Sequence, residues 1–148
     1  MKRELRELVK QLVDELLDEA TYRKDYVEGI YNVLYGALGE HCKARYAEAN
    51  GCATQQDIDH WDKEVTNHLD SEFVRCVTRK AKGFKRQSAF EEALDELRGN
   101  LPHVLRWAKK QVSKKCAIDI NRLEEPREDL INTFFIRVIV EFEFHITA

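Results

Sequence analysis

Four side chains that can bind a metal or transfer protons recur along one predicted helix. Asp57, His60, Glu64 and His68 are spaced at i, i+3, i+7 and i+11, which places them on one side of the helix, beside its apolar stripe. Di-metal sites in helical bundles combine such carboxylates and histidines with matching ligands from other helices. No other segment repeats the motif, so we expect a solvated polar flank, no bound metal and no cofactor.

The four cysteines are dispersed along the chain at Cys42, Cys52, Cys76 and Cys116. They form neither a C-x-x-C pair nor the dense framework of a small disulfide-stapled domain, and the histidines do not complete a zinc-ligand spacing. Three of the four fall within helical patterns. We therefore expect small side chains in or near the core and, by default, a reducing cytoplasmic setting.

One short motif resembles a catalytic pattern. The stretch from Arg98 to His103 has the Arg-x(4 to 6)-His spacing of helical ribonucleases of the HEPN type. The match covers six residues. The resemblance implies an all-helical ribonuclease in which these two side chains act on RNA, although Gly99 and Pro102 within the motif indicate a turn between helices.

Charge is unevenly distributed along the sequence. The chain holds 24 basic and 27 acidic residues, a net charge of −3. Residues 1–74 hold 9 basic and 16 acidic side chains, a net of −7; residues 75–122 hold 13 and 5, a net of +8; residues 123–148 hold 2 and 6, a net of −4. A basic middle segment thus lies between two acidic ones.

The basic segment gives three alternative interpretations. Clustered cations with aromatic neighbours can neutralise phosphates and stack on bases, which would make this segment a nucleic-acid interface. Alternatively, the acidic helices face it within or between subunits, or the cations are solvated helix faces. The residues in question are Arg75, Arg79, Lys80, Lys82, Lys85, Arg86, Arg106, Lys109, Lys110, Lys114 and Lys115.

The hydrophobic pattern predicts neither a signal peptide nor a membrane span. Charged residues interrupt the first 20 residues every two or three positions, and no apolar run reaches the roughly 18 residues that a membrane helix needs. We therefore expect no membrane partner.

The apolar spacing predicts a succession of amphipathic helices. Apolar residues at steps of three and four indicate a first helix over 5–20, a second from an Asp25-x-x-Glu28 capping box to Ala49, and a third from a Thr54-x-x-Asp57 capping box to about residue 76. A Ser88-x-x-Glu91 box predicts a fourth helix that ends at Gly99, and Pro102 suits the first turn of a fifth. Three glycines in the second helix, at 29, 36 and 39, suggest a closely packed neighbour.

The last segment, LINTFFIRVIVEFEFHITA, has two readings. Residues 136–146 alternate apolar and polar with one exception, as a β-strand does, whereas polar residues at steps of four from Thr133 to His145 fit a helix. We favour the helix, because a lone strand would leave both its edges unpaired unless it met a second subunit.

These patterns predict an all-α, single-domain bundle of five or six helices over residues 1–148. We expect a non-catalytic interaction protein that binds other proteins, as a homodimer, because the apolar C-terminal segment and the wide stripe on the first helix both need cover. A nucleic-acid-binding accessory protein that uses residues 75–115 is the alternative. A HEPN-like ribonuclease or a metal-dependent helical enzyme is the second alternative.

Overall fold

Helices form nearly all of the computed structural model, which describes residues 2–79, 83–127 and 129–147. No strand occurs in those ranges, so the all-α prediction is confirmed. The α-helices are α1 (Lys2–Ala49), α2 (Gln55–Asn67), α3 (Val74–Thr78), α4 (Arg86–Gly99), α5 (Leu101–Cys116) and α6 (Leu130–Thr147). A π-helix, η1 (His68–Phe73), joins α2 to α3, and a short 3-10 helix, η2 (Ile120–Arg122), follows α5.

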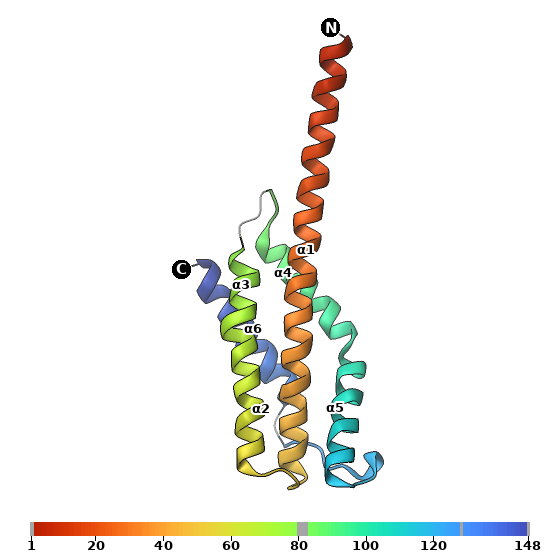
Figure 1. Cartoon of the computed structure of the whole chain (residues 1–148), viewed down its shortest axis with the longest axis vertical. Coiled ribbons are helices and arrows are strands. Elements are labelled where there is room, and N and C mark those ends of the chain that lie inside the picture. The colour runs from red at the N-terminus through yellow and green to blue at the C-terminus, as the bar shows by residue number, and fades with distance from the viewer. Residues whose placement is uncertain (1, 80–82, 128, 148) are drawn as a thin grey trace.

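The long helix α1 is the spine of the molecule. Its C-terminal half contacts each of the other α-helices, which surround it to form the body of the protein (Figure 1). The N-terminal half continues straight out of this body as a free rod. The core accordingly begins at Tyr26 and Val27 on α1, the first buried residues of the helix.

The predicted break between residues 20 and 25 is wrong, because α1 is continuous there. The chain contains neither proline nor glycine between Leu5 and Val27 to interrupt the helix. Thr21 stays within it and donates its hydroxyl to the carbonyl oxygen of Leu17 at 2.9 Å. A potential cap such as Asp25 supplies about 1 kcal/mol, and it starts a helix only where the preceding residues leave helical geometry.

The other predicted helix boundaries were partly right. Thr54 and Asp57 form the expected capping box in both directions at the start of α2. The α4–α5 turn lies at Asn100, with Pro102 in the first turn of α5, as predicted. Ser88, however, does not cap α4, which begins two residues earlier, after the turn at Gly83 with its left-handed φ of +82°. Instead, Ser88 accepts a hydrogen bond from Arg23 at 3.2 Å.

The C-terminal segment is the helix α6, so the alternative of a strand is wrong. As a helix it places Phe134, Phe135, Val138 and Phe142 on one side, where all four are buried. Phe142 stacks on Phe90 of α4 with 3.9 Å between ring centroids. A strand over the same residues would have sent alternate side chains to opposite faces and split this set.

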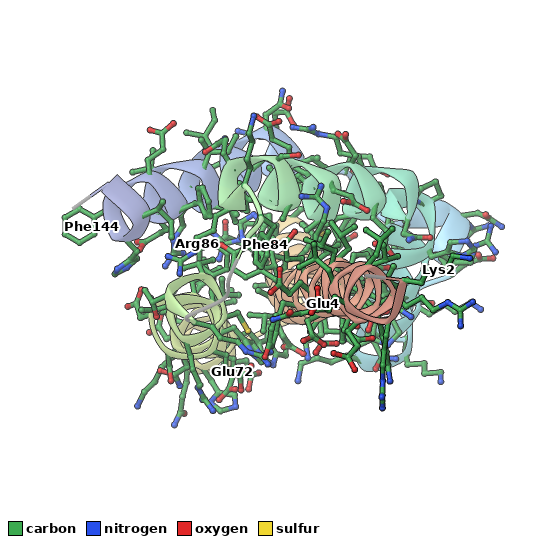
Figure 2. All side chains as sticks on the ribbon, turned by 90° about the horizontal axis from the view of Figure 1, so that it is seen from above. Lys2, Glu4, Glu72, Phe84, Arg86 and Phe144 are labelled. Atoms are coloured by element: carbon green, nitrogen blue, oxygen red, sulfur yellow. A yellow bond between two sulfur atoms is a disulfide. The ribbon has the colours of Figure 1, made fainter. Side chains whose placement is uncertain are left out.

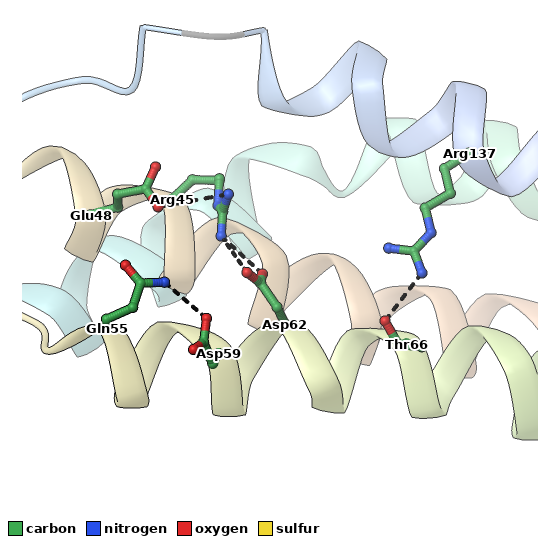
Figure 3. A network of polar contacts seen from close by, with 7 residues as sticks. All are labelled: Arg45, Glu48, Gln55, Asp59, Asp62, Thr66 and Arg137. Atoms are coloured by element: carbon green, nitrogen blue, oxygen red, sulfur yellow. Dashed lines mark hydrogen bonds and ion pairs between the residues drawn. The ribbon is translucent and has the colours of Figure 1, made fainter.

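Polar contacts at the edge of the core connect α2 to its two neighbours (Figure 3). Arg45 of α1 donates to both carboxylate oxygens of Asp62 at 2.9 and 2.8 Å, and Arg137 of α6 donates to the hydroxyl of Thr66 at 3.3 Å. Both hydrogen bonds come from one guanidinium nitrogen, Nη2, and join a cation to a carboxylate, which makes them stronger than neutral hydrogen bonds. These contacts link α2 to α1 and to α6.

A disulfide, which we did not expect from the sequence, joins Cys52 to Cys116. Their Cα atoms are 5.3 Å apart and their sequence separation is 64 residues. The bond ties the turn after α1 to the end of α5. Cys42 is buried and Cys76 half-buried, as expected of core thiols, and burial raises the pKa of Cys42 to about 12.

The expectation of close packing at the helix glycines holds for Gly39 and fails for Gly36. A Cβ atom at Gly39 would lie 3.1 Å from the Trp107 ring, whereas one at Gly36 would meet open space. We expect Gly36→Ala to stabilise the protein by about 0.5–1 kcal/mol through helix propensity. Gly39→Ala gains the same propensity, but its Cβ meets the Trp107 ring at 3.1 Å, so the ring has to shift, which offsets the gain.

Urea unfolding of the two variants measures this difference. Gly36→Ala should shift the midpoint upward, and Gly39→Ala should leave it unchanged or lower it. Equal stabilisation by both substitutions would contradict the close packing of Trp107 on Gly39.

Candidate interaction surface

The projecting part of α1, residues 2–20, is called the arm here. Every side chain from residue 2 to residue 18 is exposed, and these residues project beyond the other helices (Figure 1). Figure 1 shows its free length, and Figure 2 looks down it, with Lys2 and Glu4 labelled near its tip. Seven large apolar side chains on the arm are 47–64% exposed: Leu5, Leu8, Val9, Leu12, Val13, Leu16 and Leu17.

These apolar residues occupy one side of the arm. Their spacing of three and four residues aligns them on a broad face of the helix, as the sequence predicted. The same spacing continues beyond Leu16 through Ala20 and Arg23 to Val27 and Ile30, which are buried in the body. The arm therefore presents to solvent the continuation of the face that packs on the core.

Charge divides the arm into two halves. Residues 2–10 carry four basic and two acidic side chains, whereas residues 11–20 carry four acidic side chains and no basic one. At the base of the arm, the Glu19 side chain lies against Gly83 in the connection between α3 and α4. Just inside the body, Arg23 pairs with Glu92 of α4 at 2.8 Å. These contacts anchor the base and leave the apolar face open.

A second exposed apolar strip lies on the outer side of α6. Ile136, Val140 and Phe144 follow one another at steps of four and are 58–65% exposed. Phe144 projects away from the body near the end of this helix (Figure 2). The strip has three large side chains against the seven of the arm, and it belongs to a helix whose opposite face is already buried.

A shallow groove of about 220 Å³ crosses the body between α1 and α5. Tyr35 and Trp107 line it, and Gly36 and Gly39 add no side chains to it. The ammonium of Lys43 lies 5.7 Å from the centre of the Trp107 ring and 4.9 Å from that of Trp61. The groove thus places aromatic side chains beside two glycines of α1.

The four predicted metal or proton-transfer residues are not assembled into a site. Asp57 caps α2 and pairs with Lys115 at 3.5 Å, and its hydrogen bond to Thr54 is the main cause of a lowered pKa. His68 contacts Glu72, one turn away, at 3.0 Å. Within the described ranges, no group of three or more histidine, cysteine or acidic residues is placed to hold a metal ion.

The predicted basic residues fall into two groups at different ends of the body. Arg75, Arg79, Lys85 and Arg86 belong to α3, α4 and their connection, at the end next to the arm (Figure 1); Lys80 and Lys82 lie outside the described residues. The other group lies along α5, which runs toward the opposite end, and consists of Arg106, Lys109, Lys110, Lys114 and Lys115. The two groups are not brought to one place.

Part of the α5 group is already paired within the chain. Lys109 contacts Glu125 at 3.2 Å and Lys115 contacts Asp57 at 3.5 Å. Arg106, Lys110 and Lys114, one turn apart from each other, are exposed and form no ion pair with any described residue. A short stripe of three cations therefore remains open on α5.

The two residues of the ribonuclease-like motif lie on either side of the α4–α5 turn. Arg98, in the last turn of α4, pairs with Asp95 at 3.2 Å and lies over the Phe135 ring at 4.9 Å. His103 is exposed in the first turn of α5, beside Asn100 and Tyr31. No contact recorded for the described residues joins Arg98 to His103, so their joint action remains a prediction.

His41 is a titratable side chain at the edge of the core. Its Nε2 atom is buried and has no hydrogen-bond partner among the described residues, and its ring lies 5.7 Å from that of Phe134. Burial, and then the charge of Arg45, lower the pKa of His41 from its ordinary 6.5. The unfolded chain therefore takes up this proton at a higher pH than the folded protein does.

We expect stability to fall as the pH drops below 6.5, the ordinary value for His41, and to keep falling until the lowered folded pKa is passed. Thermal unfolding between about pH 5 and 7.5 measures this, and His41→Gln should flatten the profile in that window. Asp57 and Glu125 have lowered pKa values in the folded state, and the stability that they contribute is lost mostly as the pH falls through their ordinary values of 3.8 and 4.5, below this window. An unchanged slope in His41→Gln would contradict the assignment.

In the part of the chain that the structure describes, no helix combines the length and the apolar character needed to cross a membrane. Comparisons with protein-family models, curated proteins and solved structures find no match to this chain.

Proposed function

We propose that this chain is a non-catalytic interaction protein that binds another protein molecule through the apolar face of the arm, and that it does so as a homodimer. The observation that carries the proposal is the set of seven large apolar side chains, each about half exposed, on a helix that the rest of the described chain leaves uncovered. Covering each of them contributes roughly 1 kcal/mol. Exposed apolar faces of this extent mark interaction sites.

The shape of the arm supports the same reading. The side chains of residues 2–18 are all exposed, so this part of the arm contributes nothing to the core of the body. Most helical stability in proteins comes from packing of an amphipathic face, and burial of the arm's apolar face against a partner would supply that packing. The helices of paired amphipathic assemblies have this pattern of apolar and charged residues.

Size-exclusion chromatography with light scattering tests the proposal. At micromolar concentration we expect a species of twice the 17.4 kDa chain mass. Leu12→Asp places a charge at the centre of the apolar face and should give a monomer with an intact body. Gln11→Asp adds the same charge on the opposite side of the arm and should leave the dimer intact.

The result also locates the interface. A monomer at all concentrations would contradict self-association. A dimer that survives Leu12→Asp but not Val140→Asp would move the interface from the arm to the outer strip of α6, against the proposal.

Nucleic-acid binding is the second candidate, and the open stripe on α5 favours it. Arg106, Lys110 and Lys114 are exposed at a spacing of one helical turn, beside the partly exposed Trp107. If three phosphates are neutralised, the affinity for duplex DNA should fall with a log–log salt slope near −3. Fluorescence anisotropy at low salt measures this, with Lys110→Glu as the weakened variant, and no binding at low salt would rule the candidate out.

The sequence led us to propose a cytoplasmic location. The Cys52–Cys116 disulfide favours an oxidising compartment instead. Disulfides are rare in the reducing cytosol and persist in oxidising compartments. Alkylation of thiols in intact cells distinguishes the two settings. Free Cys52 and Cys116 would support the cytoplasm, and protected ones an oxidising compartment.

A further inference from the structure

We propose that two copies of this chain pair through their arms in antiparallel orientation, in the register that places Leu5 opposite Leu16 of the second copy and Val9 opposite its Leu12. This inference rests on the proposed function, since it specifies how the arm binds a second copy. Three features of the arm carry it: the heptad positions of its apolar residues, the charges that end this series, and the place of the body on α1.

The apolar residues fit a heptad pattern. With Val9 and Leu16 at the a positions, Leu5 and Leu12 occupy the d positions, and Leu8 and Val13 flank them. In an antiparallel pair an a residue of one helix packs against a d residue of the other. The register above therefore forms four consecutive apolar layers, two of Leu5 with Leu16 and two of Val9 with Leu12.

The next positions in the pattern are charged and select the orientation. Lys2 is the a residue before Leu5, and Glu19 is the d residue after Leu16. The antiparallel register brings Lys2 of each copy to Glu19 of the other, whose half-buried side chain lies against Gly83, so an ion pair closes both ends of the apolar layers. A parallel pair would instead place Lys2 against Lys2 and Glu19 against Glu19, which is unfavourable.

The two halves of the arm agree with this choice. In antiparallel pairing, residues 2–10, which are mainly basic, lie beside residues 11–20 of the second copy. The charged residues of that second segment are all acidic. Parallel pairing would set the acidic half of one copy beside the acidic half of the other, with Glu19 against Glu19 at the interface. Juxtaposed like charges disfavour that arrangement.

The body excludes the parallel arrangement on steric grounds. Beyond the arm, the same face of α1 is covered by the chain's own helices, beginning at Tyr26 and Val27. Two parallel helices in register would therefore direct each body into the other. In the antiparallel pair the bodies lie at opposite ends of the joined arms, and each tip reaches only to the base of the partner's arm (Figure 1).

Thiol cross-linking of the full chain tests the orientation. Lys2→Cys and Glu19→Cys lie at the ends of the apolar layers, so neither removes an apolar contact. In an antiparallel pair, residue 2 of one copy neighbours residue 19 of the other, whereas in a parallel pair these residues are about 25 Å apart. The linker is a short bis-maleimide, and the unaltered chain is the blank for the native thiols Cys42 and Cys76.

We expect the equal mixture of the two variants to yield linked dimers that contain one chain of each, up to half of all dimers, and each variant alone to yield few. Asp14→Cys, on the opposite side of the arm, is the matched control and should not link to Lys2→Cys. Self-linking of Lys2→Cys alone and of Glu19→Cys alone would overturn the antiparallel assignment in favour of a parallel pair.

Light scattering on the same samples separates this inference from the proposed function. Dimers that link in neither combination would overturn the arm pairing while leaving self-association intact. A monomeric chain would overturn the proposed homodimer itself. If the chain alone stays monomeric and its arm binds only a different protein, the proposed pairing with a second copy is likewise wrong.

Discussion

Replacing Phe90 with alanine is expected to lower the free energy of unfolding by about 3–5 kcal/mol. Phe90 is 1% exposed and lies where α4 meets α6 and η1. Its ring stacks on Phe142 at 3.9 Å with planes 3° apart, and its centroid is 6.2 Å from that of Phe73. Alanine would remove this ring and leave a cavity among side chains that are themselves held on three separate elements.

Chemical denaturation at fixed protein concentration measures this effect, because association would otherwise shift the apparent stability. Each kcal/mol corresponds to about 2–4 °C in Tm for a chain of this size. Phe144→Ala is the matched control: the same substitution at a side chain that is 65% exposed should cost no more than about 0.5 kcal/mol. Similar losses for both variants would contradict the assigned packing of α6.

Opening the Cys52–Cys116 disulfide is expected to cost about 2–4 kcal/mol. The bond closes a loop over a sequence separation of 64 residues, so its loss restores considerable freedom to the unfolded chain. It also holds the turn after α1 against the end of α5, on the side of the body away from the arm. We therefore expect reduction to destabilise the body and to leave the arm's pairing surface unaltered.

Denaturation with and without reductant measures the contribution of the disulfide. The double variant Cys52→Ser/Cys116→Ser should match the reduced native protein and should not respond to reductant. Because Cys42 and Cys76 are still present in that variant, it also controls for effects on the free thiols. A native protein indifferent to reductant would contradict a stabilising disulfide.

Local sequence patterns were sufficient for most of the helices. The Thr54–Asp57 capping box, the turn at Asn100 and the position of Pro102 depend on contacts within a few residues, and each lies where it was predicted. The same reasoning failed at Asp25 and at Ser88. Both residues can cap a helix, but a cap contributes about 1 kcal/mol and starts a helix only where the preceding residues leave helical geometry, which the residues before Asp25 and Ser88 do not.

The sequence predicted the apolar face of the arm but not its exposure. The stripe from Leu5 to Leu17 was visible as an amphipathic helix with a face that needs cover, and that inference used spacing alone. Its exposure could not be deduced, because exposure depends on how far the remaining helices extend along α1. Likewise, the sequence showed the basic residues of 75–115 as one segment, whereas folding sends α5 away from the α3–α4 connection and divides them.

The sequence by itself determined the helical character of the chain, its amphipathic faces and its segregated charge, because these follow from residue types and spacings of three and four. Only the tertiary structure decided that α6 is a helix packed on Phe90 and that Cys52 meets Cys116. The reason is that each of these depends on contacts between residues far apart in the chain. The exposed face of the arm combines both: its pattern is local, and its lack of cover within the described chain is a property of the fold.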